Sequence, residues 1–181
     1  MKADLDQLEH TNFKHILLPI SSEYTRSFLL LYNITMLISD EKQKRLDRYF
    51  MDVAIRTSEM SYAERAKVGC ILTYNNRIIA TGWNGQPSGI DNCCEYRDSN
   101  NNLITLPTVI HAEANLISFC AKYGIRMNGS TLYLSLSPCI TCALLILQTG
   151  ISRVVYNDEY RNKEGINFLN EHGILCEKIE D

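Results

Sequence analysis

The sequence predicts a three-layer α/β domain with a mixed central sheet of five strands. The first observation is a β-hairpin pattern over residues 68–81. The second is an alternation of helix-like and strand-like segments after residue 110. The third is a glycine just beyond each of these helical segments, at Gly124, Gly150 and Gly173, where glycine commonly ends a helix.

The N-terminal part of the chain differs from the rest and contains no recognisable chemical motif. We predict a short buried helix over Ser27–Ile38 and a solvated linker or helix start over residues 40–45 ("DEKQKR"). Residues 46–60 repeat apolar side chains at helical intervals, which predicts an amphipathic helix. We therefore place an N-terminal extension, expected to be helical, over residues 1–44 and the main domain over residues 45–181.

The hairpin consists of two apolar, β-prone runs, residues 68–74 and 77–81, around Asn75-Asn76. Two asparagines between such runs favour a tight turn. Residues 84–107 are rich in Gly, Asn, Asp and Pro and predict a long loop, which in a compact domain is often functional.

The remaining elements follow in alternation. We predict helices over residues 111–123, 139–148 and 159–172, and strands over residues 131–135, 153–157 and 174–179.

Composition limits the classes of function. The chain has 181 residues and a net charge of −3, which disfavours a protein that grips long nucleic acid through a basic face. The N-terminal residues lack the pattern of a secretory signal. The most apolar run, residues 28–38, is too short to span a bilayer. These features predict a soluble, cytoplasmic protein without a membrane partner.

The chain contains seven cysteines, an odd number, and this favours free or metal-bound thiols in a reducing compartment. Cys139 and Cys142 stand three residues apart after a proline, in "SPCITC". Such a pair can form a disulfide, act in redox chemistry, bind a metal or fill a core. At the first turn of a helix both sulfurs can face one ion, and the helix N-terminus favours the thiolate form.

A third ligand and a catalytic acid are available in "HAE". His111 opens the preceding predicted helix, and Glu113 can face the same pocket without binding metal. A catalytic zinc site uses three protein ligands and leaves one position for water. Together, His-x-Glu and Pro-Cys-x-x-Cys form the signature of zinc-dependent nucleobase deaminases. Separately, His111 could be a core histidine and Glu113 a charge that complements the helix dipole.

From residue 46 to the C-terminus, the sequence resembles the cytidine deaminase-like superfamily, and most closely the deoxycytidylate (dCMP) deaminases. The resemblance is carried by "VGCILTYNNRIIATGWNG", "PSG…NCCEY", "HAEANLI" and "LSLSPCITCALLILQTGISRVVY". It implies hydrolytic conversion of dCMP to dUMP for thymidylate synthesis. It also implies a homohexamer that is activated by dCTP, with Mg²⁺ accompanying the triphosphate, and inhibited by dTTP.

The resemblance also implies roles for individual residues. One zinc ion per chain would be bound by His111, Cys139 and Cys142, with Glu113 as proton shuttle. The positions matched to substrate contacts are Asn84, Ala112, Ser135, Leu136, Ser137 and Tyr160. The positions matched to allosteric nucleotide binding are Gly82, Trp83, Asn84, Gly85 and Lys122.

Other interpretations of these residues stay open at this point. Asn84 could simply adopt a left-handed turn, and Tyr160 could be an ordinary core or surface residue. The cysteines on apolar faces are expected to be small core residues: Cys70, Cys120 and Cys176. Three basic residues could bind a phosphate or face solvent: Arg56, Arg65 and Lys67.

The sequence departs from the family pattern in two places. Some phage members have a second, structural zinc with ligands in a long insertion before HAE. Here the residues between Cys94 and His111 contain no histidine or cysteine, and Cys93 and Cys94 have no obvious partners. The N-terminal 44 residues also exceed the short lead-in usual for the family.

Three competing functions remain. A bifunctional enzyme would accept dCTP as well as dCMP. A nucleic-acid base deaminase, such as a tRNA adenosine deaminase, would share the zinc site, but the acidic charge balance disfavours it. A non-catalytic zinc scaffold would have no need for Glu113.

Overall fold

The computed structural model describes residues 22–179, with side chains from Thr35 onward. Contacts divide the chain into two units, Met1–Arg45 and Leu46–Asp181, and the second contains every strand. Within residues 22–179, no helix combines the length and apolar character needed to cross a bilayer.

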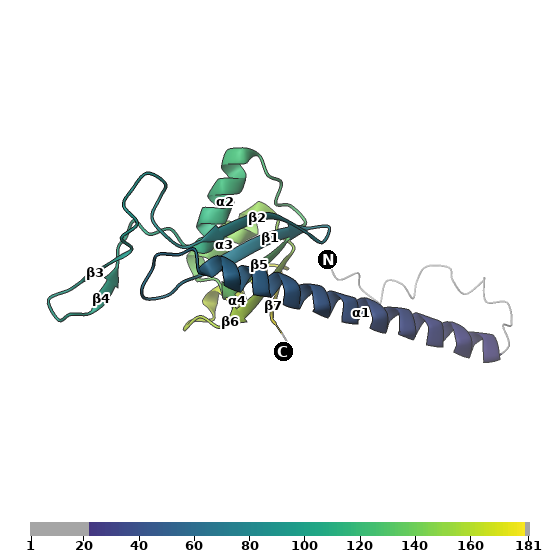
Figure 1. Cartoon of the computed structure of the whole chain (residues 1–181). Coiled ribbons are helices and arrows are strands. Elements are labelled where there is room, and N and C mark those ends of the chain that lie inside the picture. The colour runs from purple at the N-terminus through teal and green to yellow at the C-terminus, as the bar shows by residue number, and fades with distance from the viewer. Residues whose placement is uncertain (1–21, 180–181) are drawn as a thin grey trace. The chain divides into compact units, whose positions relative to one another are not determined.

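A mixed five-stranded sheet forms the centre of the second unit, as the sequence predicts (Figure 1). Its strands are β1 (Gly69–Tyr74), β2 (Arg77–Trp83), β5 (Thr131–Leu136), β6 (Arg153–Asp158) and β7 (Leu175–Lys178). They lie in the order β2-β1-β5-β6-β7. The β2-β1 and β1-β5 pairs are antiparallel, whereas β5-β6 and β6-β7 are parallel.

The β1–β2 connection is the predicted two-residue turn. Asn75 and Asn76 have φ values of 48° and 58°. Two consecutive residues with positive φ give a turn whose twist matches the flanking strands, and asparagine tolerates this conformation better than most residues do.

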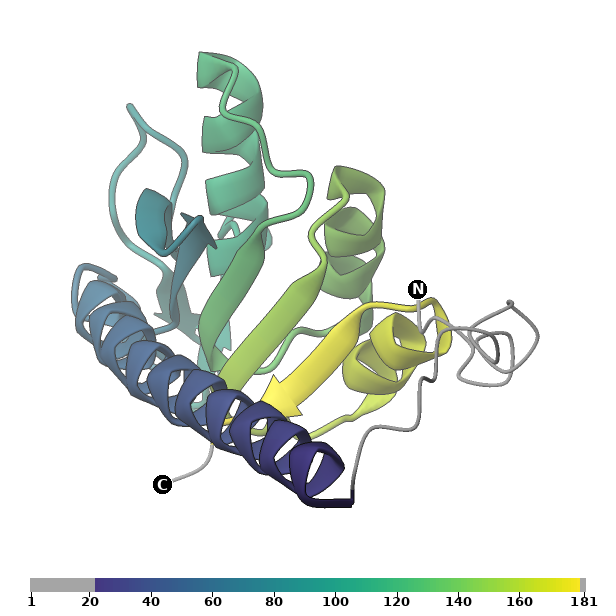
Figure 2. The same cartoon turned by 90° about the vertical axis from the view of Figure 1, so that its right-hand side faces the viewer.

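Helices cover both faces of the sheet, and alternate side chains on each strand point to opposite layers (Figure 2). One face packs on α2 (Ala112–Tyr123), α3 (Ile140–Thr149) and α4 (Glu164–Glu171). The other face packs on the end of α1 (Ser22–Ser58), where Phe50, Met51 and Ala54 are buried. The three-layer prediction is confirmed.

The predicted core cysteines lie in the larger of these layers. The side chains of Cys70 and Cys120 are fully buried, and that of Cys176 is 9% exposed. They pack among the apolar residues between the sheet and the helices α2, α3 and α4. The interpretation of these cysteines as small core residues is confirmed.

Helix α1 corrects two expectations. It runs without interruption from Ser22 to Ser58, so residues 40–45 are not a linker. Their Glu, Lys, Gln and Arg side chains are good helix formers, and no Gly or Pro interrupts them. The predicted buried helix is also wrong where its side chains are described, because Met36, Leu37 and Ile38 are 55–65% exposed. The side chains of residues 27–34 lie outside the described residues.

Two further elements differ from the prediction. The long loop contains a separate two-stranded hairpin, β3 (Glu95–Arg97) and β4 (Leu103–Thr105). Asp98 stabilises its turn, because its carboxylate accepts hydrogen bonds from the backbone N–H groups of Asn100 and Asn102. The last helix, α4, begins at Glu164 instead of residue 159. The preceding residues form a loop at the pocket described below.

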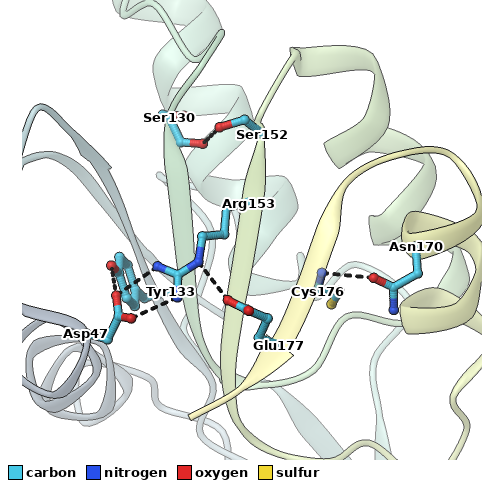
Figure 3. A network of polar contacts seen from close by, with 8 residues as sticks. All are labelled: Asp47, Ser130, Tyr133, Ser152, Arg153, Asn170, Cys176 and Glu177. Atoms are coloured by element: carbon cyan, nitrogen blue, oxygen red, sulfur yellow. Dashed lines mark hydrogen bonds and ion pairs between the residues drawn. The ribbon is translucent and has the colours of Figure 1, made fainter. Parts of the chain in front are cut away.

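A buried ion-pair network attaches α1 to the sheet (Figure 3). The guanidinium of Arg153 on β6 donates two hydrogen bonds of 2.8 Å to the carboxylate of Asp47. It donates a third, also 2.8 Å, to Glu177 on β7. The Tyr133 hydroxyl on β5 donates to Asp47 at 2.6 Å. Asp47 thus joins the helix to two neighbouring strands in a bidentate, charge-assisted arrangement.

We expect Asp47→Ala to lower the free energy of unfolding by about 2–3 kcal/mol, because it leaves a largely buried guanidinium and a buried hydroxyl without their acceptor. The control is Arg56→Ala, which removes an exposed ion pair with Glu59 and should change stability by less than about 1 kcal/mol. Urea denaturation of both variants measures the difference. If both variants lower the free energy of unfolding equally, the Asp47 network contributes no more to stability than an exposed ion pair.

Candidate active site and metal centre

Three potential metal ligands converge where α2 and α3 begin. His111 is the N-cap of α2, Cys139 is the N-cap of α3, and Cys142 lies in the first turn of α3. The Nδ1 atom of His111 lies 3.6 Å from the sulfur of Cys139 and 3.4 Å from that of Cys142. The three ligand atoms lie within 4.8 Å of one another.

This geometry fits zinc. With Zn–S bonds of about 2.3 Å and Zn–N bonds of about 2.0 Å, a tetrahedron places its nitrogen and sulfur ligands about 3.5 Å apart. The two measured N–S separations agree with that value. One histidine and two cysteines leave a fourth position open, which is the pattern of a catalytic site and not of a closed structural one.

The two thiols differ strongly in acidity. Hydrogen bonds from Cys142 and His111 lower the pKa of Cys139 to about 3. The hydrogen bond with Cys139, followed by burial, raises the pKa of Cys142 far above the usual thiol value. The two thiols thus share a hydrogen bond that favours ionisation of Cys139, and a bound divalent cation would favour the thiolate form of both.

Glu113 lies beside this cluster and is 4% exposed. Burial raises the pKa of its carboxyl above the ordinary glutamate value. A carboxyl group with a raised pKa accepts and returns protons more readily near neutral pH. Helix α2 therefore presents a ligand and a proton-transfer group at its first turn.

The cluster opens into a pocket of about 410 Å³, a size that suits a small organic ligand. His111, Glu113 and Cys139 line one part of it. Five of the six residues expected to contact substrate also line it: Asn84, Ala112, Leu136, Ser137 and Tyr160. Ser135 is not among the lining residues, because its hydroxyl points to the backbone N–H of Gly69 at 3.0 Å.

The pocket is also lined by residues that the sequence analysis did not assign to substrate binding, or assigned only as one alternative. Arg161 lies at 5.5 Å over the ring of its neighbour Tyr160. Arg65 also lines the pocket, whereas Arg56 pairs with Glu59 and Lys67 is exposed outside the lining. The other unpredicted lining residues are Ala66, Val68, Glu95, Thr105, Val109 and Glu159. Val68 and Glu95 lie in segments that carry the family resemblance but were not matched to substrate contacts, and the fold brings all of these residues to one pocket.

Asn84 is fixed by the backbone of the adjacent segment. Its side-chain amide donates to the carbonyl of Ala66 at 2.9 Å and accepts from the N–H of Val68 at 2.8 Å. It is not among the residues with positive φ, so the left-handed alternative is wrong. Asn84 keeps one N–H and one lone pair available toward the pocket.

The residues expected to bind an allosteric nucleotide occupy two separate places. A Cβ on Gly82 would lie 2.7 Å from the carbonyl oxygen of Ala112, so only glycine permits this approach of β2 to α2. The carbonyl of Trp83 accepts from Asn115 of α2 at 2.7 Å. Gly85 pairs with Ile110 just before His111.

Lys122 lies eleven residues beyond His111, about 16 Å along the helix, and its ammonium group is 5.4 Å from the centre of the Tyr123 ring. The residues Gly82–Gly85 therefore contact the helix start, whereas Lys122 lies near the other end.

Close packing also determines the position of Cys139. A Cβ on Gly165, in the first turn of α4, would lie 2.1 Å from the carbonyl oxygen of Pro138. The Ser137 hydroxyl accepts a 2.8 Å hydrogen bond from the N–H of Tyr160. These contacts attach the loop with Tyr160 and Arg161 to the turn that carries the cysteines.

The fold and this cluster define the class of zinc-dependent deaminases. A family model described as the cytidine and deoxycytidylate deaminase zinc-binding region matches residues 44–158. The chain belongs to this family.

Individual proteins of this family are similar to the chain in sequence and in structure. The chain is 36% identical to deoxycytidylate deaminase of Saccharomyces cerevisiae over 83% of its length, and the match spans 53% of the yeast protein. It is 33% identical to the deoxycytidylate deaminase of Enterobacteria phage T4, over 64% of this chain and 79% of the phage protein. The structure resembles the crystal structure of dCMP deaminase from cyanophage S-TIM5 in complex with dCMP and dUMP, with a TM-score of 0.69 and 39% identity. That match covers 74% of this chain and 96% of the cyanophage chain.

We expect the purified chain to contain about one zinc per molecule, and Cys142→Ser to lose most of it, because a serine hydroxyl is a much poorer zinc ligand than a thiolate. The matched control is Cys93→Ser, which changes an exposed cysteine outside the cluster and should keep the metal. Elemental analysis after extensive dialysis provides the measurement. Equal zinc in both variants would contradict the assigned ligands.

Proposed function

We propose that this protein hydrolytically deaminates dCMP to dUMP and thereby supplies dUMP for thymidylate synthesis. The observation that carries the proposal is the convergence of His111, Cys139 and Cys142 beside a buried glutamate in a ligand-sized pocket. The cyanophage dCMP deaminase structure, which contains dCMP and dUMP, supports the choice of substrate.

The chemistry follows from the positions of these groups. Zinc in such a site makes a water molecule nucleophilic near neutral pH. Glu113 is the group that would move protons: its carboxylate would accept one from the water as the oxygen bonds to C4, and deliver it to the ring nitrogen. It would then pass the second proton of the water to the amino group, which leaves as ammonia when the C4–N bond breaks. Glu113 is almost fully buried and lines the pocket, so its carboxyl group faces the space in which a substrate would bind.

The pocket favours a substrate that carries a phosphate group. Arg65 and Arg161 both line it, and guanidinium groups match phosphate oxygens in charge and geometry. Tyr160 is next to Arg161, so an aromatic ring for the base and a cation for the phosphate come from adjacent residues. We therefore assign the arginines to the 5′-phosphate and Asn84 to the sugar.

The alternatives gain less support. A nucleic-acid base deaminase requires a basic surface for a long polyanion, and the chain has a net charge of −3. A bifunctional dCMP/dCTP deaminase would need further cations for two more phosphates. Besides the two arginines, the pocket is lined by three acidic residues, Glu95, Glu113 and Glu159, and these would repel additional phosphates.

We expect the wild-type chain to release ammonia from dCMP with a kcat/KM at least about tenfold higher than from deoxycytidine, because only the nucleotide engages the arginines.

Glu113→Gln should lower kcat on dCMP by a factor of about 10² to 10⁴, because the amide cannot transfer the proton, while zinc content and unfolding temperature remain unchanged. Initial rates on deoxycytidine, dCMP and dCTP provide the measurement.

Two outcomes would contradict the proposal. A chain that acts on deoxycytidine but not on dCMP would overturn the substrate assignment. A chain that binds zinc but deaminates none of the three compounds would overturn the proposed activity and leave a zinc scaffold or a nucleic-acid base deaminase.

We also propose a cytoplasmic homohexamer that is activated by Mg²⁺-dCTP and inhibited by dTTP. This part rests on the family resemblance and on the contacts of Gly82 and Trp83 with α2. An effector that moves these residues would displace the helix that carries His111 and Glu113.

We expect a sigmoidal dependence of rate on dCMP concentration that dCTP makes hyperbolic and dTTP shifts to higher concentrations, because effectors redistribute two states of different affinity. Steady-state rates with and without each effector test this. A hyperbolic curve that neither triphosphate alters would contradict regulation, and sedimentation would test the hexamer independently.

A further inference from the structure

Arg65 is fixed at two points by one small hairpin. On β3, the carboxylate of Glu95 accepts hydrogen bonds from two consecutive backbone N–H groups, those of Glu64 at 3.1 Å and Arg65 at 3.4 Å. On β4, the hydroxyl of Thr105 accepts a 2.9 Å hydrogen bond from the Arg65 guanidinium. Glu95 and Thr105 are directly paired in the register of the hairpin.

These contacts restrict an otherwise flexible residue. Arg65 is exposed, and an exposed arginine side chain samples many rotamers that a ligand must restrict on binding. Glu95 fixes the backbone from which the side chain starts, and Thr105 fixes its end. The hairpin therefore prepares the guanidinium at the pocket before a ligand arrives.

The burial of Glu95 suggests its task. The residue is 8% exposed and lines the pocket, yet a carboxylate repels a phosphate. Its oxygens are directed to the N–H groups of Glu64 and Arg65, which compensate the buried charge. A carboxylate in this place is unsuited to contact an anion, but it is suited to orient the cation that does.

The geometry points to Glu95 as a positioning residue that sets the preference for a nucleotide over a nucleoside by orienting Arg65, with Thr105 as the second support. This inference rests on the proposed deamination of a phosphate-bearing cytosine substrate. It adds that the discrimination depends on a hairpin outside the central sheet.

The test compares Glu95→Gln with the matched control Glu64→Gln. Glutamine at position 95 keeps one acceptor oxygen but turns an NH₂ group toward a backbone N–H, so the segment loses part of its support. We expect about a tenfold higher KM for dCMP, less than a threefold change in kcat, and less than a threefold change in kcat/KM for deoxycytidine. Glu64 is exposed and outside the pocket lining, so its variant should match wild type.

Thr105→Val provides a second variant if Glu95→Gln folds poorly. It removes the acceptor for the guanidinium while keeping the shape of a half-buried side chain, and it should raise KM for dCMP by about threefold. Combining either change with Arg65→Ala should give no further loss beyond Arg65→Ala alone, because both act through the same guanidinium.

The outcomes are distinct. Equal losses on dCMP and deoxycytidine, no loss on either, or full additivity with Arg65→Ala would each overturn the positioning role. A wild-type chain that neither binds nor deaminates either compound would overturn the proposed function as well. A wild-type chain that prefers dCMP, together with a Glu95 variant of unchanged preference, would overturn this inference alone.

Discussion

The close approach of two helix starts is the constraint on which the rest of the site depends. His111 and Cys139 are both N-cap residues with extended backbone, and neither makes a side-chain capping hydrogen bond. Both side chains are therefore free to face the same point between the helices. Gly82 lets β2 approach α2, and Gly165 lets α4 approach the Pro138–Cys139 peptide. Tight backbone packing thus sets the separation of three ligand atoms.

Around this centre, helix starts carry the residues for metal binding and proton transfer, whereas loops carry the residues assigned to substrate recognition. The ligands and Glu113 lie at helix starts supported by the central sheet. The groups assigned to the sugar and phosphate, Asn84, Arg65 and Arg161, lie outside the helices and strands of the central domain, in loops held by hydrogen bonds such as those to Asn84 and Tyr160. Chemistry common to a family needs fixed geometry, whereas recognition of a particular substrate can vary with the loops.

The sequence predicted the sheet and the clustering of His111, Cys139 and Cys142 because both depend on local patterns. Apolar, β-prone runs identify strands, and His-x-Glu and Cys-x-x-Cys are two short motifs that identify candidate ligands. Arg161, Glu95 and Thr105 could not be predicted in the same way, since only tertiary folding brings them to one pocket. The continuity of α1 was missed because charged residues typical of a linker are also good helix formers.

The network around Asp47 has a consequence for how the chain is made. Asp47 and Arg153 are separated by 106 positions, and Phe50, Met51 and Ala54 pack against residues of β1, β5 and β6. During synthesis the ribosome releases Phe50, Met51 and Ala54, the apolar stripe of helix α1, long before β6 emerges. For that interval the stripe is without its docking face, so the nascent polypeptide is an expected client for chaperones that shield hydrophobic segments.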